Sequence, residues 1–545
     1  MEANTYDFIV VGAGSAGSVL ANRLSASGDY RVLCLEAGTE GSNYIWSRIP
    51  IGVAKLIDNP AVNWCYSCEP DDGSGQRRIE VPRGKMLGGS SSINGMVFVR
   101  GQRQDYDHWA QLGNRGWSYQ DVLPLFKMLE SYEGGSDEFR GRDGLLKVTD
   151  SPQITPFFEK LIQSAEKIGI KRNPDYNGAE QEGIAMTQAT INKGRRQSTA
   201  YCYLDPARGR PNLTIETGAM AASLILEGKR CVGVRYTVHG QPREARATRE
   251  VIVSSGSINS PKLLELSGIG QPDLLREHGI ELRHELPGVG ENLRDHYSPR
   301  MRFSITEKDA TFNDKGRGWK LVREVMNYAI SRKGFMAMSS VPIRMYFRTR
   351  EGLDSPDATI SVMPFLAERV NRERRIARQR GVTMNINVLR SDSRGSIHIK
   401  SADPDEPPAI NFNFLSSELD RTGVIIAMRK GRELMAAPPV SDIVGEELAP
   451  GPAYQTDEEL LEWVRNNAET TYHPVGTCKM GQDAMAVVDD QLRVHGIEGL
   501  RVADASIMPT LTSGNTNAST LTEHFSPIMI EGAFVLPDVL SLIHI

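Results

Sequence analysis

The chain has 545 residues, of which 40% are hydrophobic and 24% are charged, and it contains 51 glycines. This length exceeds what one simple core holds, so an ordinary globular protein with at least two structural units is expected. The net charge of −5 and the pI near 6.1 provide no overall basic field. They exclude general binding to nucleic acid or to an anionic bilayer and favour small-molecule partners.

Six cysteines are few for this length and predict reduced thiols in a reducing compartment. Cys65 and Cys68 form a C-x-x-C pair, but the alternation across residues 64–68 favours a strand over a metal or redox site. The N-terminus leaves no room for a signal peptide, and no run of about 18 apolar residues occurs. We therefore expect a cytoplasmic protein without a metal site or transmembrane segment, with peripheral membrane association left open, as a monomer or homodimer.

The first 36 residues predict a β-α-β unit: a strand over 6–11, a turn over 12–17, a helix over 18–27 and a strand over 31–36. Gly12, Gly14 and Gly17 have the G-x-G-x-x-G spacing of a dinucleotide fingerprint. Gly12 permits the turn, Gly14 lets a pyrophosphate approach, and Gly17 allows close packing of the helix whose N-terminus attracts anions.

Glu36 ends the second strand, where its carboxylate can accept hydrogen bonds from ribose hydroxyls. The same charge would repel a 2′-phosphate, which disfavours NADP. The fingerprint does not separate FAD from NAD. Residues 83–95 form a second segment rich in glycine and serine, which can present backbone N–H groups to a phosphate or a flavin edge, or can be a flexible turn.

Later strands are predicted over 250–256 and 500–504, and a helix over 262–266 after Ser260-Pro261. Between 301 and 463 the pattern changes to runs in which apolar and polar residues alternate, such as 359–363 and 396–400. An amphipathic helix is predicted over 424–437. The fold class expected is α/β: a Rossmann-like dinucleotide-binding domain plus an α+β substrate domain with an antiparallel sheet. We assign residues 1–155, 195–300 and 464–545 to the first domain, and 156–194 and 301–463 to the second.

The six arginines between residues 369 and 380 are interpreted as a solvated loop.

Two segments near the C-terminus, 471–478 and 513–517, carry the candidate catalytic residues His473 and Asn515. A neutral imidazole is suited to accept a hydroxyl proton near pH 7, and an amide can hold a substrate oxygen without titrating. We expect kcat/KM to rise with pH through an apparent pKa of roughly 6 to 8.

Residues 83–95 and 256–270 together resemble the two signature motifs of the glucose–methanol–choline (GMC) oxidoreductases. Residues 286–293, 393–395 and 501–506 agree with the family in the same order. The resemblance extends from Tyr6 to about Thr520, and within the family the sequence is most similar to the choline-dehydrogenase-like branch.

This resemblance implies an FAD-dependent oxidoreductase that oxidises a CH–OH group by hydride transfer to flavin N5, with His473 as base and Asn515 as orienting donor. The cofactor residues that it implies are Gly12, Gly14, Ser15, Ala16, Gly17, Glu36, Ala37, Leu87, Gly88, Gly89, Ser90, Asn94, Gly95, Ala221, Asp504, Ala505 and Asn517.

The chain departs from the family pattern at two places. Some members bind the flavin covalently through a histidine in the first signature, and Ile93 occupies that place here, so a noncovalent cofactor is expected. After Asn517, residues 520–527 place a helix-breaking proline where most members continue an apolar helix, and the terminal segment to Ile545 matches nothing expected of the family.

Several alternatives stay open at this level. The electron acceptor is O₂ or a quinone, and the alcohol that serves as substrate is not identified. A second hypothesis is a hydroxynitrile-lyase-like enzyme with a structural FAD, and a third is a flavin-binding protein that has lost activity.

Overall fold

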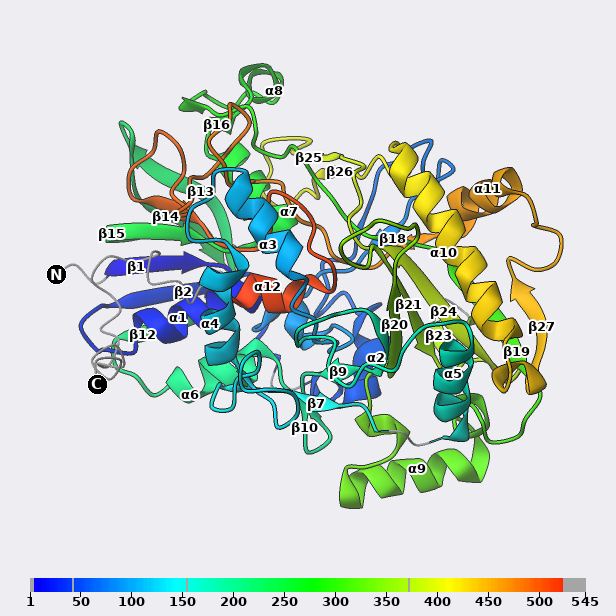
Figure 1. The fold of residues 1–545 in the computed structure, drawn as a ribbon. Coiled ribbons are helices and arrows are strands. Elements are labelled where there is room, and N and C mark those ends of the chain that lie inside the picture. Colours follow the sequence, from blue (N-terminus) through cyan, green and yellow to red (C-terminus); the bar gives the residue numbers. More distant parts are fainter. Residues whose placement is uncertain (1–3, 42–43, 153–154, 371–372, 523–545) are drawn as a thin grey trace, which may run out of the picture.

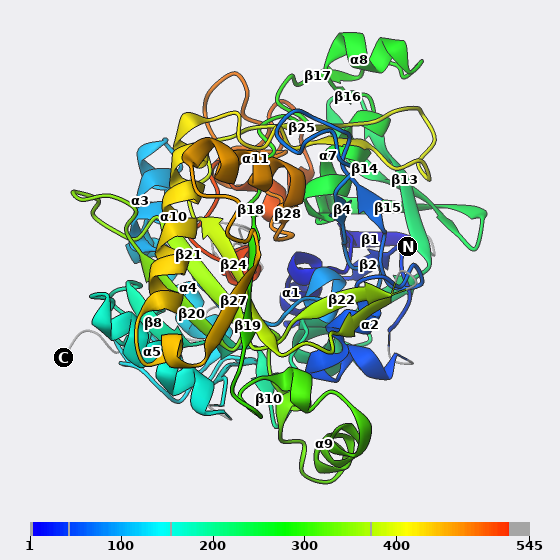
Figure 2. The ribbon, with the colours of Figure 1, turned by 90° about the vertical axis from the view of Figure 1, so that its right-hand side faces the viewer.

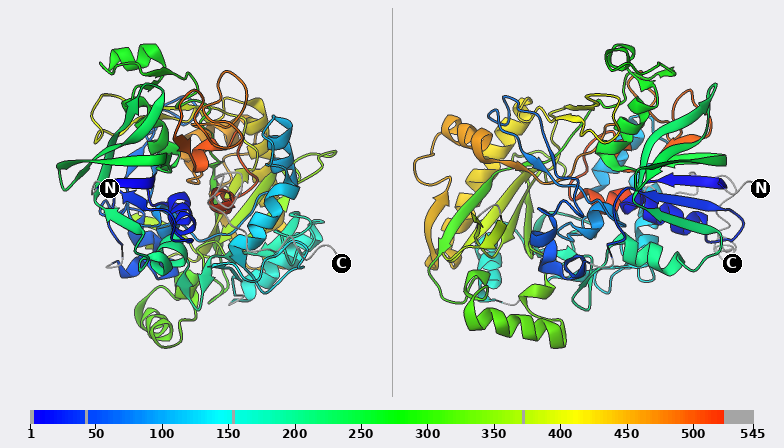
Figure 3. Two further views of the ribbon diagram at one scale, coloured as in Figure 1. Left: turned by 90° about the vertical axis from the view of Figure 1, so that its left-hand side faces the viewer. Right: turned by 180° about the vertical axis from the view of Figure 1, so that it is seen from behind.

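Two large sheets at opposite ends of the molecule organise the chain (Figure 1). The structure is a computed structural model that describes residues 4–41, 44–152, 155–370 and 373–522. Helix α12, Thr516–Thr522, lies between the two sheets (Figure 1). The view from behind shows the same separation of the sheets (Figure 3).

The first sheet has a parallel core in the order β12-β2-β1-β15, with β29 also parallel to β15. Its antiparallel extension is β14 and β13. The bounds are β1 Thr5–Val11, β2 Val32–Glu36, β12 Leu213–Thr217, β13 Ala219–Glu227, β14 Arg230–Val238, β15 Gln241–Val253 and β29 Leu500–Val502. The apolar runs of β1 and β2 are buried, as parallel strands covered on both faces require.

The Rossmann-like β-α-β unit is present, but helix α1, Ser15–Leu24, begins three residues before the predicted Ser18. Only Gly12 to Gly14 form the turn. The helix can begin this early because Gly17 has no side chain: a Cβ at Gly17 would lie 1.8 Å from the carbonyl oxygen of Gly12.

Helix α7, Gly256–Leu266, also begins earlier than predicted, so Pro261 lies inside the helix. Proline has no N–H to donate to the carbonyl oxygen of Ser257 one turn earlier. The Thr477 hydroxyl donates to this oxygen instead, at 2.6 Å. That contact explains why the proline does not set the start of the helix.

The second sheet is antiparallel throughout, in the order β27-β19-β24-β21-β20-β8, as the alternating sequence predicted. The bounds are β8 Gly183–Met186, β19 Arg300–Ile305, β20 Ile343–Phe347, β21 Ala358–Met363, β24 Gly381–Val388 and β27 Val444–Ala449. Helices α10, Glu418–Ala436, and α5, Pro156–Lys167, cover its outer face (Figures 1 and 2). Apolar side chains such as Met345, Ile360 and Ile386 form the core of this layer.

Three predictions for this half of the chain need correction. Residues 396–398 form strand β25, but it pairs with β26, Ala409–Asn411, outside the main sheet. The arginine-rich segment is not a plain loop, because strands β22, Ala367–Val370, and β23, Glu373–Ile376, pair there as a hairpin. Helix α10 begins at Glu418, six residues before the predicted start, with the Ser417 hydroxyl capping its N-terminus.

The remaining helices are α2 Val53–Leu56, α3 Arg103–Gln111, α4 Tyr119–Leu129, α6 Asp205–Ala207, α8 Pro272–Glu277, α9 Gly318–Ser331 and α11 Asp457–Asn467. Helix α9 projects from the body of the molecule, with Trp319 and Ile330 exposed (Figure 2). Within the described ranges, no helix combines the length and the apolar character needed to cross a bilayer.

The short strand pairs are β3 Tyr66–Ser67 with β4 Glu80–Val81, β5 Glu130–Ser131 with β6 Leu146–Lys147, β7 Thr149–Asp150 with β9 Gln188–Ala189, β10 Ile191–Asn192 with β11 Arg195–Arg196, β16 Ile269–Gly270 with β17 His284–Glu285, and β18 Tyr297–Ser298 with β28 Glu469–Thr470. The six cysteines are free thiols. A strand is present between Cys65 and Cys68, but β3 is shorter than the predicted 64–68 and leaves both cysteines outside it.

Candidate active site

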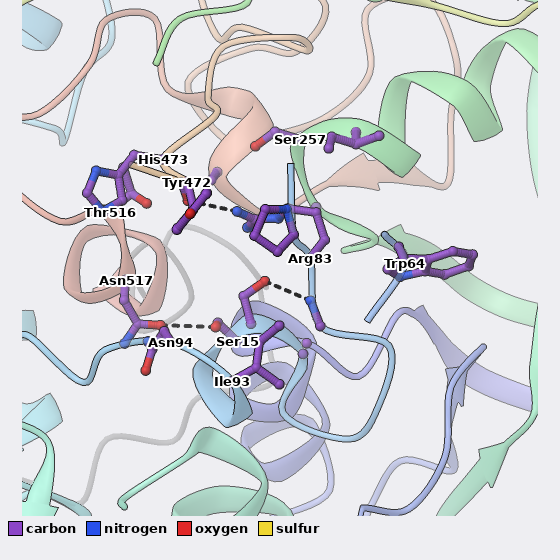
Figure 4. A pocket seen from close by; sticks show the side chains of 18 of the residues that line it. Ser15, Trp64, Arg83, Ile93, Asn94, Ser257, Tyr472, His473, Thr516 and Asn517 are labelled. Carbon is purple, nitrogen blue, oxygen red and sulfur yellow. Dashed lines mark hydrogen bonds between the residues drawn. The ribbon is translucent and has the colours of Figure 1, made fainter. Parts of the chain in front are cut away.

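A cavity of about 460 Å³ lies between the two sheets. It extends from the carboxyl ends of β1 and β2, the edge at which open α/β sheets bind ligands, to the inner face of the second sheet. Most of the predicted site residues line it: Gly12, Gly14, Ser15, Ala16, Glu36, Ala37, Gly89, Ser90, Asn94, Gly95, Ala221, His473, Asp504, Ala505, Asn515 and Asn517. Figure 4 labels Ser15, Asn94, His473 and Asn517 among the side chains that line it.

Three predicted cofactor residues do not line the cavity. Leu87 is buried in the core of the first sheet, and the N–H of Gly88 donates to the carbonyl oxygen of Ala13 at 2.8 Å. Gly17 packs against Gly12 inside the first helical turn. In this structure these residues support the walls of the cavity from behind.

The nucleotide end of the cavity has the features that a pyrophosphate needs. A Cβ added at Gly14 would meet only the Cα of Gly89, at 4.0 Å, so this backbone is open toward the cavity. The first turn of α1 presents N–H groups without partners in the helix, together with its positive dipole end. Ser15 in that turn donates to the side-chain oxygen of Asn517 at 3.0 Å, which ties α1 to α12 (Figure 4).

Glu36 is buried at the end of β2, and its two oxygens accept the N–H groups of Ala13 and Gly38 at 3.1 and 2.8 Å. Burial raises its pKa to about 7, against the effect of these hydrogen bonds. The carboxylate oxygens keep further lone pairs on the cavity side, as ribose hydroxyls require.

At the other end, His473 and Asn515 lie side by side. The amide nitrogen of Asn515 is 2.8 Å from Nε2 of His473, and the Asn515 oxygen accepts from Nη1 of Arg344 at 2.6 Å. On the far side of the imidazole, Nδ1 of His473 lies 3.0 Å from Nδ1 of His296 and 3.0 Å from the Thr471 hydroxyl. Nε2 of His296 lies 2.9 Å from the carbonyl oxygen of Leu389.

The two ends of this chain of contacts fix the direction of every hydrogen bond in it. A guanidinium can only donate, and a carbonyl oxygen can only accept. Arg344 therefore donates to the Asn515 oxygen, and the Asn515 amide donates to Nε2 of His473. At the other end, Nε2 of His296 carries a proton for Leu389, so its Nδ1 accepts from Nδ1–H of His473. In neutral His473 the unshared electron pair is consequently on Nε2, which faces Asn515.

The loop that carries His473 is held by a buried carboxylate. Asp295 accepts the backbone N–H of His473 at 3.0 Å and that of His296 at 2.7 Å, and it also accepts the hydroxyl of Thr470. Burial raises the pKa of Asp295 to about 7. The side chain thus positions both histidines through their main chain.

Burial favours the neutral form of both imidazoles. Burial, followed by the neighbouring His296, Arg344 and Arg83, lowers the pKa of His473 well below 6.5. Burial also lowers the pKa of His296 to about 4. The lowered pKa of His473 does not support the expectation that the base titrates between pH 6 and 8. The sequence could not show this, because it reveals neither the burial of His473 nor its cationic neighbours.

Sequence reasoning missed Asp295, His296 and Arg344. The first two lie one residue beyond the motif at 286–293, after Arg294, so an Asp-His pair close to a recognised motif was an available signal. Arg344 is the charged residue in the otherwise apolar strand Ile343–Phe347, which is the second signal. Within the described part of the chain, no group of acidic, cysteine and histidine side chains could hold a metal ion.

Comparison with known proteins identifies the family of this chain. Family models described as GMC oxidoreductase match residues 6–298 and 391–522. The chain is 42% identical to an oxygen-dependent choline dehydrogenase of Escherichia coli over 95% of this chain and 93% of that protein.

Two solved structures extend the comparison. A pyridoxine 4-oxidase from Mesorbium loti has a TM-score of 0.85 and 28% identity, over 95% of this chain and 97% of that one. A formate oxidase of Aspergillus oryzae, described for the effect of a mutation on FAD modification, has a TM-score of 0.89 and 26% identity, over 97% and 98%.

Proposed function

The chain belongs to the GMC oxidoreductase family, and from that premise we propose that His473 is the base of an alcohol oxidation, with Asn515 orienting the substrate oxygen. The family membership and the relatives together establish the reaction class: the protein is an FAD-dependent oxidoreductase that acts on CH–OH groups. The bound flavin supplies the hydride acceptor, at its N5.

The protein's own contribution begins with the proton of the substrate hydroxyl. The main support for this role is the chain of hydrogen bonds from Arg344 to Leu389, which leaves the unshared electron pair of His473 on Nε2. A hydroxyl that replaces or shares the Asn515 contact can donate to this pair. As the C–H hydride leaves, the hydroxyl proton passes to Nε2 of His473 and the alcohol carbon becomes a carbonyl carbon.

Asn515 supports this transfer without titrating. Its oxygen is held by Arg344, so its amide group must face His473 and the cavity. One N–H can donate to the substrate oxygen while negative charge develops there. His296 and Asp295 act through His473 as positioning residues, because they contact the imidazole or its loop and do not line the cavity.

The cofactor residues proposed are those of the nucleotide end: Gly14 and the α1 N-terminus for the pyrophosphate, and Glu36 for the ribose. We also propose that the flavin is bound noncovalently. Ile93 lines the cavity and is 4% exposed, and an alkyl side chain offers no atom for a bond to the flavin.

For the electron acceptor we propose O₂ rather than a quinone. The similar proteins carry names that include oxygen-dependent and oxidase. Rapid return of the flavin absorbance when oxygen is admitted to anaerobically reduced enzyme would support O₂. Slow return in air, with fast return on adding a soluble quinone, would reject it.

The function itself is tested by anaerobic addition of an alcohol panel to the purified holoenzyme. Net oxidation requires loss of the absorbance of the oxidised flavin. A protein that binds FAD as a structural group, or has lost activity, would keep its oxidised spectrum with every alcohol.

A further inference from the structure

The inner face of the second sheet is polar where it meets the cavity. Arg344 on β20 pairs directly with Ser361 on β21, and Ser361 pairs directly with Asn385 on β24. Directly opposed residues point to the same face of a sheet, and all three line the cavity. Asn387, two residues further along β24, lies on the same face and also lines it. The opposite face, against α10, is apolar.

Arg344 is a buried cation without a counter-ion. It is 4% exposed, and among the described residues it forms no ion pair with a carboxylate. Its Nη1 donates to Asn515, its guanidinium carbon lies 5.5 Å from the centroid of the Tyr346 ring, and its Nε has no hydrogen-bond partner in the protein. Arg300, which also lines the cavity, differs because Glu469 pairs with it at 2.6 Å.

Two polar neighbours of Arg344 on this face of the sheet are unsatisfied as well. The hydroxyl of Ser361 and the side-chain oxygen of Asn387 are buried and have no partner within the protein. Buried polar groups are normally hydrogen-bonded, and an uncompensated buried charge is costly. A cluster of such groups that faces one cavity is typical of a ligand site.

The charge balance of the cavity favours an anion. Among the described residues that line it, Glu36 and Asp504 are the acidic ones. Glu36 lies at the nucleotide end, and both oxygens of Asp504 accept hydrogen bonds from Gly256, Ser260 and Ser506. The end that holds His473 contains Arg83, Arg300 and Arg344.

Orientation of Asn515 alone does not account for this arrangement. A neutral donor such as an amide could hold the Asn515 oxygen without the cost of burying a charge. The guanidinium of Arg344 has five N–H donors, and one of them donates to Asn515.

We propose that the alcohol oxidised at His473 also carries a carboxylate, and that Arg344 binds this carboxylate with help from Ser361. This inference rests on the proposed function and adds the substrate class to it. A quaternary ammonium alcohol such as choline would place its positive charge near the unpaired guanidinium of Arg344, with no free carboxylate at this end to balance it. The substrate preference of this protein therefore differs from the preference for choline that the name of the Escherichia coli relative indicates. In the reaction, the CH–OH group loses a hydride to FAD and a proton to His473, and the carboxylate is unchanged.

The decisive experiment compares three alcohols with one HO–CH₂–CH₂ frame: 3-hydroxypropanoate, 1-propanol and choline. Anaerobic flavin reduction gives kcat/KM for each. The proposal predicts the order 3-hydroxypropanoate, then 1-propanol, then choline. A higher kcat/KM for choline than for 3-hydroxypropanoate would overturn it.

A binding measurement that needs no turnover accompanies it. Propanoate and propanamide are titrated into the oxidised holoenzyme, and the flavin absorbance reports occupancy. Propanoate should bind about 10- to 100-fold more tightly, which is the worth of a charge-assisted hydrogen bond. Equal affinity for the two would contradict the assignment, even if no tested alcohol reduced the flavin.

The variant Arg344→Met separates binding from positioning. If Arg344 only orients Asn515, kcat/KM for 3-hydroxypropanoate and for 1-propanol should fall by the same factor. If it binds the carboxylate, their ratio should fall by about 10- to 100-fold, and Arg344→Lys should restore part of it. Arg348→Met is the matched control, because Arg348 directly follows the same strand but is exposed and paired with Glu182.

The outcomes for the function and for the substrate class are distinguishable. If no alcohol of a broad panel reduces the flavin, the proposed oxidation fails. If neutral alcohols reduce it and Arg344→Met leaves the ratio unchanged, the oxidation stands and the carboxylate site is rejected. If Arg344→Met does not fold, the propanoate and propanamide affinities of the wild-type protein decide.

Discussion

Nδ1 of His296 lies 3.0 Å from Nδ1 of His473, and this contact determines which nitrogen of His473 carries a proton. His296 is committed as a donor to Leu389 through its other nitrogen. It can therefore only accept from His473, and the unshared pair of His473 is directed to Asn515 and the cavity. The Thr471 hydroxyl can accept from the same Nδ1–H, because it donates to the carbonyl oxygen of His296.

Removal of His296 should slow the reaction without releasing the cofactor. In His296→Ala, Nδ1–H of His473 loses one of its two acceptors, and the imidazole can rotate or change tautomer. We expect kcat to fall by about 10- to 100-fold, corresponding to the loss of a buried hydrogen-bond partner. Flavin content per protein should stay at the wild-type value. His108→Ala, at an exposed position on α3, is the control and should retain full kcat.

The two glycines of the fingerprint should fail in different ways when changed to alanine. Gly14→Ala adds a methyl group that projects toward the cavity, so the protein should fold but lose FAD affinity. Gly17→Ala forces a Cβ against the carbonyl oxygen of Gly12 and should lower the free energy of unfolding by about 1–3 kcal/mol. Thermal unfolding of the apo forms, together with flavin titration, distinguishes them. Equal loss of stability in both variants would count against open space at Gly14.

Because Ile93 cannot form a covalent bond to the flavin, acid precipitation should release the flavin from the protein. The supernatant should carry the yellow colour and the pellet should be white. A pellet that keeps the flavin spectrum after washing would show a covalent bond and reject the role given to Ile93.

The pH dependence should show a base that is neutral over the physiological range. The pKa of His473 is lowered, and the base works in its neutral form, so kcat/KM should be flat above about pH 6.5 and fall only in more acidic solution. Removing the positive charge in Arg344→Met should raise the apparent pKa and move this fall to higher pH.

Asp295 is the other titrating group on this loop, with a pKa raised to about 7. The variant Asp295→Asn shows which part of the pH dependence of kcat/KM comes from the titration of Asp295. A wild-type profile that rises through pH 6 to 8 and is unaffected by both substitutions would contradict the electrostatic environment described for His473.

The parts of this protein that local sequence determines were predicted well. Apolar periodicity and glycine spacing predicted strands β1 and β2, the glycine turn and the antiparallel strands after residue 301. The motifs predicted FAD and the reaction class. Errors occurred where distant residues decide the outcome. The start of α7 depends on Thr477, more than 200 residues away in sequence. The pKa of His473 is lowered first by burial and then by His296 and Arg344, which the sequence does not place beside it.

The substrate end of the cavity illustrates the same limit. The alternation in β20, β21 and β24 predicts strands, but it does not reveal which strands pair or in which register. Only the register brings Arg344, Ser361 and Asn385 into one row. The domain boundaries and the roles of the cofactor residues stay predictions, as does the segment after Thr522, including Pro527, which lies outside the described residues.

The most direct measurement is the anaerobic reduction of the bound flavin by an alcohol, in the wild-type protein and in His473→Ala with equal flavin content. We expect the wild-type flavin to be reduced by at least one alcohol, and reduction in His473→Ala to be slower by about 10² to 10⁴, the usual contribution of a general base. Reduction of the His473→Ala flavin at more than a tenth of the wild-type rate would show that another group takes the hydroxyl proton.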